Sequence, residues 1–126
     1  MTDEPIPADL REFILGHIDS IAQLEALLLL RRNPTTTWNP SSLARRLYIG
    51  DGEASDLLRR LNDDGFLMVD EGSYRFDPQC SKRRDTVDRL ADAYSHHLIP
   101  ITNMIHGKPR RIREFSDAFR FRRDRP

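Results

Sequence analysis

Residues 39–77 constrain the fold more than any other part of this chain, because they combine a helix cap, two short apolar-periodic segments, two turns and a hairpin signal. Asn39 can cap free backbone N–H groups with its side chain, and Pro40 then occupies the first helical position, where a missing N–H costs nothing. The spacing that follows predicts a helix over 40–47. Its inward-facing residues are Leu43, Ala44 and Leu47.

A second helix and a hairpin follow this first helix. Residues 48–52 form the turn between the helices, with glycines available for positive φ. The second helix is expected over about 52–64, and Gly65 stands where a left-handed C-cap is common. Residues 66–76 contain two β-prone segments around Glu71-Gly72, a dipeptide resembling the Asp-Gly turn of two-residue hairpins.

Two apolar segments precede this unit. The first predicts a short helix within residues 7–18, and the second predicts a helix over about 20–32. Ser20 and Gln23 are spaced as a capping box, in which each side chain bonds the other residue's backbone amide. Because residues 21–30 are apolar on nearly every side of the helix, nearly every side must be covered. We expect part of this helix to contact the C-terminal helix or a second subunit.

A heptad pattern marks residues 79–107, which we interpret as one long helix. Apolar residues recur there at alternating steps of four and three, the seam along which two helices pack lengthwise. Pro100 removes one backbone hydrogen bond and is expected to kink the helix near the His96 carbonyl. The seam, which we expect to pack in cis or to form a dimer, consists of Val87, Ala91, Tyr94, Leu98, Ile101 and Ile105.

Residues 108–126 are predicted to form a short basic helix and a basic tail. Ile112, Phe115 and Phe119 lie at helical spacing, so we expect them to dock onto this protein or onto a partner subunit. The Phe- and Arg-rich stretch 119–123 has a second interpretation, in which its arginines contact phosphates and its aromatic rings stack on nucleic-acid bases. The helical spacing favours docking.

The net charge of the 126 residues is zero, but the charges are unevenly distributed. Residues 1–77 carry 14 acidic and 8 basic side chains, whereas residues 78–126 carry 6 acidic and 12 basic ones. Within these halves, residues 51–77 have a balance of −5 and residues 108–126 a balance of +5. Such asymmetry suits a basic arm for nucleic acid, an arm for an acidic protein surface, or attraction between the two halves.

The order of helices, turn and hairpin in residues 19–78 is that of a winged helix-turn-helix domain. The expected fold class is mainly α with a small β-hairpin (α+β). A short helix within residues 1–18 comes before the domain, and a long dimerisation helix within residues 79–107 follows it. At 126 residues, the chain suits a single domain with a modest core.

Several segments of the chain also resemble a known family. Residues 43–47 (Leu-Ala-Arg-Arg-Leu) and 57–67 (Leu-Leu-Arg-Arg-Leu-Asn-Asp-Asp-Gly-Phe-Leu) are similar to winged helix-turn-helix domains of MarR-like bacterial regulators. The chain looks still more like a poorly characterised group of small bacterial MarR-like proteins, a likeness that includes residues 17–20, 23–32 and 117–124. The regulator resemblance implies a dimer bound to double-stranded DNA and a role in transcription regulation.

A DNA-binding protein of this kind would place its second helix in the major groove and contact phosphates from neighbouring elements. The candidate DNA contacts are Ser55, Arg59 and Arg60 in the groove, Arg45 and Arg46 on phosphates, and Arg75 on the adjacent backbone.

The same second helix also carries acidic side chains, namely Asp51, Glu53, Asp56 and Asp63. Three of them crowd the helix N-terminus, where they suit the helix dipole but would face phosphates in the usual docking. They either stabilise an exposed helix or bind a protein partner. In the second interpretation the winged fold serves as a protein-protein interaction module with little or no DNA binding.

The sequence offers no catalytic, metal or cofactor site. We find no phosphate-binding glycine loop, nucleophile elbow or paired carboxylates, and the four histidines lack the spacing of metal ligands. A single cysteine, Cys80, cannot form an intrachain disulfide. No apolar stretch reaches the roughly 20 residues that a membrane span needs, and the N-terminus does not resemble a signal peptide. We therefore expect a cytoplasmic, non-enzymatic homodimer.

Overall fold

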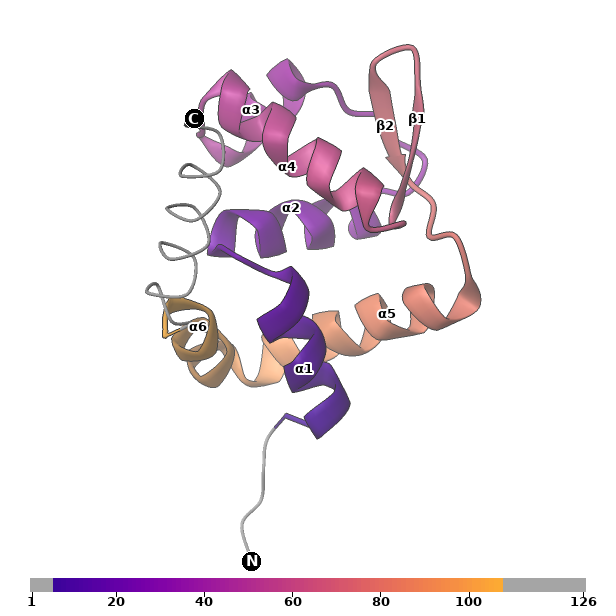
Figure 1. Cartoon of the computed structure of the whole chain (residues 1–126). Helices are drawn as coiled ribbons and strands as arrows, with labels where there is room; N and C mark the ends of the chain where they lie inside the picture. Colours follow the sequence, from indigo (N-terminus) through magenta and orange to yellow (C-terminus); the bar gives the residue numbers. More distant parts are fainter. Residues whose placement is uncertain (1–5, 108–126) are drawn as a thin grey trace, which may run out of the picture.

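The computed structural model describes residues 6–107, which form a mainly helical α+β fold with one small antiparallel sheet (Figure 1). The fold class expected from the sequence is confirmed at this level. The predicted docking residues Ile112, Phe115 and Phe119 lie outside the described residues. In chain order, the elements are α1 (Ala8–His17), α2 (Ile21–Arg32), α3 (Pro40–Leu47), α4 (Asp51–Asp63), β1 (Leu67–Asp70), β2 (Ser73–Phe76), α5 (Ser81–His96) and α6 (Leu98–His106).

Helix α2 is enclosed by the rest of the chain. Leu24, Leu27 and Leu30 are completely buried, and four further residues of this helix are buried as well. Helices α3, α4 and α5 and strand β2 all contact α2 (Figure 1). The requirement that α2 be covered on nearly every side is therefore met by the described part of this chain, without a second subunit.

The start of α2 is fixed by the buried amide of Gln23. As predicted, the Ser20 hydroxyl accepts a hydrogen bond from the Gln23 backbone N–H at 3.1 Å. The Gln23 side chain bonds different partners from those predicted: its Oε1 accepts from the Asp19 N–H at 2.9 Å, and its Nε2 donates to the His17 carbonyl at 2.7 Å. Because donor and acceptor are both satisfied, this polar group can be buried in the turn between α1 and α2.

Helix α3 begins as the sequence predicts but ends differently. The Asn39 side chain accepts from the Ser42 N–H at 2.8 Å, and the Ser42 hydroxyl accepts from the Asn39 N–H at 3.0 Å. At the other end, the residue in the left-handed region is Tyr48, with a φ of 59°, whereas Gly50 has a φ of −76°. Tyr48 is therefore the left-handed C-cap of α3, although it is not a glycine. The nearest glycine, Gly50, lies two residues further along the chain.

The predicted hairpin is confirmed, and a third segment extends it. Glu71 and Gly72 both have positive φ, as in a type I′ turn, and join the two strands in a register that pairs Asp70 with Ser73. On the far side of β2, the backbones of Trp38 and Tyr74 exchange two hydrogen bonds of 2.7 Å. The hairpin is therefore tied to the chain that leads into α3.

The C-terminal part of the described chain is two helices rather than one long helix. Helix α5 ends at His96 and α6 begins at Leu98, with His97 in a non-helical conformation between them. The His97 N–H still donates to the Ala93 carbonyl at 2.7 Å. Pro100 lies in the first turn of α6, where its missing N–H leaves no helical bond unmade. The expected kink is thus a complete break.

The predicted seam is divided between the core and the surface. Val87 and Ile101 are fully buried, whereas Leu98 is 50% exposed. Helices α5 and α6 contact α1, and α5 also contacts α2, where the Tyr94 hydroxyl donates to Glu25 at 3.0 Å. The seam thus packs largely in cis, and a dimer stays a prediction. The remaining seam residues are the buried Ile105 and the half-buried Ala91.

Replacing Tyr48 with glycine is expected to stabilise the protein. A side chain in the left-handed region costs about 1–2 kcal/mol, and Tyr48 is 94% exposed, so packing does not offset the cost. After allowing for the larger entropy of glycine in the unfolded chain, we expect Tyr48→Gly to raise the free energy of unfolding by about 0.5–1 kcal/mol in urea denaturation. Tyr48→Ala keeps the Cβ atom and serves as the control. A destabilised glycine variant would contradict the assignment of strain.

Candidate functional site

Helix α4 has a buried apolar face and an exposed acidic face. The buried face packs toward α2 and α3 and consists of Ala54, Leu57, Leu58 and Leu61. Asp51 and Glu53 lie in the first turn, where carboxylates favour the helix dipole. The exposed face is formed by Asp51, Glu53, Asp56, Arg59 and Asp63, with Ser55 half-buried beside them.

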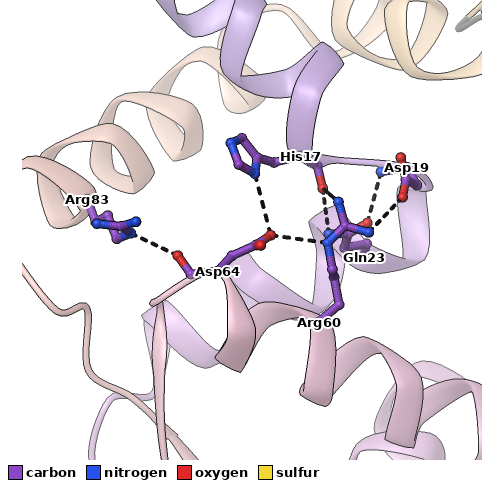
Figure 2. Close-up of polar contacts among 6 residues, drawn as sticks. All are labelled: His17, Asp19, Gln23, Arg60, Asp64 and Arg83. Atoms are coloured by element: carbon purple, nitrogen blue, oxygen red, sulfur yellow. Dashed lines mark hydrogen bonds and ion pairs between the residues drawn. The ribbon is translucent and has the colours of Figure 1, made fainter.

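Arg60, one of the candidate DNA contacts, is engaged inside the fold. Its Nη1 lies 3.0 Å from Asp19 Oδ2, and its Nε lies 3.3 Å from Asp64 Oδ2. The third guanidinium nitrogen, Nη2, donates to the His17 carbonyl at 3.4 Å (Figure 2). This guanidinium connects α4 to the turn between α1 and α2, and its contact with a groove of DNA stays a prediction.

Asp64 also contacts two further side chains besides Arg60. His17 Nδ1 lies 3.5 Å from Asp64 Oδ2, and Arg83 Nε donates to the Asp64 carbonyl at 2.8 Å (Figure 2). Gly65 has a φ of 90°, a conformation that favours glycine, and a Cβ there would lie 2.7 Å from Arg83 Nε, so a larger residue would also displace the Arg83 side chain. We call these contacts the Asp64 junction; its members are His17, Asp19, Gln23, Arg60, Asp64 and Arg83.

The other candidate DNA contacts differ in how freely they are presented. Arg59 lies 3.3 Å from Asp56, in an exposed pair, and Arg75 lies 3.5 Å from Asp77, two residues further along the chain and just beyond the end of β2. Within residues 6–107, the candidate arginines without a carboxylate partner are Arg45, which donates to the Ser41 hydroxyl at 3.2 Å, and Arg46.

The acidic candidates are presented more freely than the basic ones. Asp51, Glu53 and Asp63 are exposed and form no ion pair with any residue of 6–107. Strand β1 contacts α4, and the hairpin and α4 lie at the same end of the molecule (Figure 1). The hairpin carries the exposed Asp70 at the end of β1 and the exposed Glu71 in its turn. We define the acidic surface as Asp51, Glu53, Asp56, Asp63, Asp70 and Glu71.

Shallow grooves run between α1 and α5, away from α4. Two of them, of about 380 and 390 Å³, meet at Leu10 and at the bidentate ion pair of Arg89 with Asp9, whose N–O distances are 2.8 and 3.0 Å. The Arg89 guanidinium, together with the Leu10 N–H, holds the pKa of Asp9 at about 2. These grooves bring no nucleophile and base together, and we assign them no chemistry.

Metal ligands, the single cysteine and membrane-spanning helices were considered in the same part of the chain. Among residues 6–107, no three His, Cys, Asp or Glu side chains are placed to hold a metal ion. Cys80 is exposed at the start of α5, where hydrogen bonds from Arg83 lower the pKa of its thiol. No single helix in this part of the chain is long and apolar enough to cross a membrane; only α1 and α2 as a pair, bent by 111°, pass that criterion.

Comparison with known proteins gives no relative for this chain. No protein-family model matches it, and neither a curated protein nor a solved structure does. The candidate site is therefore defined by its own residues and geometry.

Replacing Arg60 with alanine is expected to destabilise the fold, because Asp19 and Asp64 would lose their shared cation. A charged hydrogen-bonded group contributes about 1.5–3 kcal/mol when buried; since the Arg60 side chain is 39% exposed, we expect a loss of about 1–2 kcal/mol. Arg59→Ala, which removes an exposed pair from the same helix, should change the free energy of unfolding by less than about 0.5 kcal/mol. Equal effects of the two substitutions would contradict the role of the Asp64 junction.

The ion pair of Asp9 with Arg89 predicts a stability difference that depends on pH. The folded pKa of Asp9, about 2, is below the ordinary value of 3.8, so its contribution is present above pH 3.8 and is lost as pH falls toward 2. Asp9→Asn should therefore lower the urea midpoint at neutral pH, and the gap from the native chain should shrink below about pH 4. In an Arg89→Gln background this pH-dependent gap should largely disappear. A gap that is constant from neutral to acid pH would contradict the ion pair.

Proposed function

We propose that this chain is a winged-helix protein-interaction module, whose acidic surface binds a basic segment of a protein partner. The arrangement of α3, α4 and the hairpin, with Trp38 paired beside β2, supports the winged-helix assignment. Winged helices hold a rigid second helix at the surface, and the use of that helix depends on its side chains.

The main support for this proposal is that the exposed side chains of α4 are mainly acidic. Arg60 is engaged in the Asp64 junction and Arg59 faces Asp56, while Asp51, Glu53 and Asp63 remain exposed. Duplex DNA carries about one negative charge per 1.7 Å of its axis, and neutralising phosphates supplies most non-specific affinity. An acidic surface repels such a ligand, whereas it steers and orients a basic peptide.

A second candidate function is that of a DNA-binding transcription regulator. Its specific support is that Arg45 and Arg46, on α3, have no carboxylate partner within residues 6–107. Phosphate contacts from α3 would give binding that is sensitive to salt and reads little sequence, because α4 would contribute few contacts to base edges.

Removing two carboxylates from α4 tests the first function against the second. The full chain is immobilised, and proteins that it captures from its native cells are quantified by mass spectrometry after cross-linking. We expect Asp56→Asn with Asp63→Asn to reduce capture of the partner roughly tenfold, since interfacial charge pairs contribute about 1.5 kcal/mol or more. Both side chains are exposed, so the variant should fold normally.

The matched control removes the same charge elsewhere. Glu12→Gln with Asp85→Asn changes two exposed acids on α1 and α5, and it should leave capture unchanged. If both variants lost partner capture equally, the loss would follow from net charge alone, and this would contradict a role for α4. Two results together would favour the second candidate. The chain would bind duplex DNA at low salt and lose that binding in Arg45→Gln with Arg46→Gln, and partner capture would not depend on Asp56 and Asp63.

A further inference from the structure

The sheet has one edge that is paired and one that is open. Strand β2 pairs with β1 on one side and, at Tyr74, with Trp38 on the other. Strand β1 pairs only with β2, so within residues 6–107 its outer edge has no neighbouring strand. An open strand edge is a template for an added strand.

The register of the hairpin determines which backbone groups face that edge. In a two-residue hairpin the closing pair, here Asp70 with Ser73, exchanges hydrogen bonds, and pairs alternate from there. Val69 and Leu67 therefore direct their N–H and C=O groups away from β2. Tyr74, the partner of Val69 in the hairpin, follows the same alternation: its backbone N–H and C=O point away from β1 and form hydrogen bonds with Trp38. No backbone hydrogen bond within residues 6–107 satisfies the outward groups of Val69 and Leu67.

The two faces of β1 differ in chemistry at this edge. Val69 lies on the same side of the strand as the buried Leu67 but is itself 44% exposed. The opposite side carries Met68, which is 47% exposed, and the exposed Asp70 at the end of the strand. A strand that fits here needs apolar side chains on one face and basic side chains on the other.

Residues 119–122 of this chain have that pattern. Their sequence, Phe-Arg-Phe-Arg, alternates apolar and basic side chains with the period of a β-strand. In a strand added to β1, the phenylalanines would continue the face of Val69 and the arginines would lie on the face of Asp70. The wider charges agree, since residues 108–126 have a balance of +5 and residues 51–77 a balance of −5.

We propose that residues 119–122 of a second copy of this chain add to the open edge of β1 as a third strand. Helix α6, from which the chain continues toward these residues, and the hairpin lie on opposite sides of the molecule (Figure 1), which favours exchange between two copies over folding back on one. Reciprocal exchange closes a two-fold dimer. The inference rests on the proposed function, because it identifies a basic segment that the acidic end of the molecule binds.

Amide hydrogen exchange of the full-length protein, measured by NMR, tests the added strand directly. The Val69 N–H should be unprotected in dilute protein and should exchange at least tenfold more slowly as the concentration rises from about 20 μM to about 1 mM. The Met68 N–H, which pairs with Arg75 inside the hairpin, is the internal control and should not depend on concentration. A Val69 N–H that exchanges at the same rate at both concentrations, fast or slow, would overturn the exchange of segments between copies.

A variant that keeps composition and charge separates strand addition from simple attraction. Arg120→Phe with Phe121→Arg changes the order at 119–122 to Phe-Phe-Arg-Arg, which breaks the alternation. We expect this variant to lose the concentration-dependent protection of Val69. Ile112→Ser with Phe115→Ser, which leaves 119–122 intact, should retain it. Protection that survives the first variant, or that only the second removes, would overturn the proposal in favour of charge attraction or of helix docking.

The outcomes also distinguish this inference from the proposed function. If Asp56→Asn with Asp63→Asn abolishes partner capture while Val69 exchange never depends on concentration, the acidic surface binds another protein and the added strand is wrong. If Val69 shows the expected protection but capture is independent of the two carboxylates, the strand exchange stands and α4 has no part in binding a further partner.

Discussion

Helix α2 lies at the centre of the described fold, and its burial determines where the surrounding elements pack. A twelve-residue helix with seven buried residues must be covered on all sides, and α3, α4, α5 and β2 provide this cover. Gln23 is its buried polar residue, and the bonds of its amide to Asp19 and His17 fix the turn that leads back to α1. Arg60 ties α4 to the same turn from outside, through the Asp64 junction. The face that α4 presents to solvent therefore follows from the way α2 is covered.

The parts of the fold that could be predicted from the sequence are those whose physical cause lies within a few residues. The Asn39 cap and the Glu71-Gly72 turn are of this kind. The heptad spacing correctly marked Val87 and Ile101 as buried, but spacing alone does not identify the helix against which they pack. The role of Arg60 could not be predicted, because one of its partners, Asp19, lies 41 positions away in the chain.

For the candidate site, too, local features could be predicted from the sequence, whereas contacts between distant residues could not. That α4 carries acids at Asp51, Glu53, Asp56 and Asp63 was evident from the sequence. Which of the neighbouring arginines stay available depends on tertiary contacts, and these engage Arg60 while leaving Arg46 exposed. The balance of charge that a ligand meets at α4 is therefore more acidic than the residue types alone indicate. This sign is the basis for proposing a basic protein segment as the ligand.

Amide chemical shifts along α4, followed by NMR as a mixed-sequence DNA duplex is added at low salt, report whether the acidic face of this helix meets DNA. Low salt is the condition under which phosphate contacts are strongest, so it gives DNA binding its best opportunity. We expect the amide signals of α4 to keep their chemical shifts, and any response to be limited to α3 near Arg45 and Arg46. Saturable shifts centred on Ser55 and Arg59 would contradict this expectation, because they would place the duplex on the acidic face of α4.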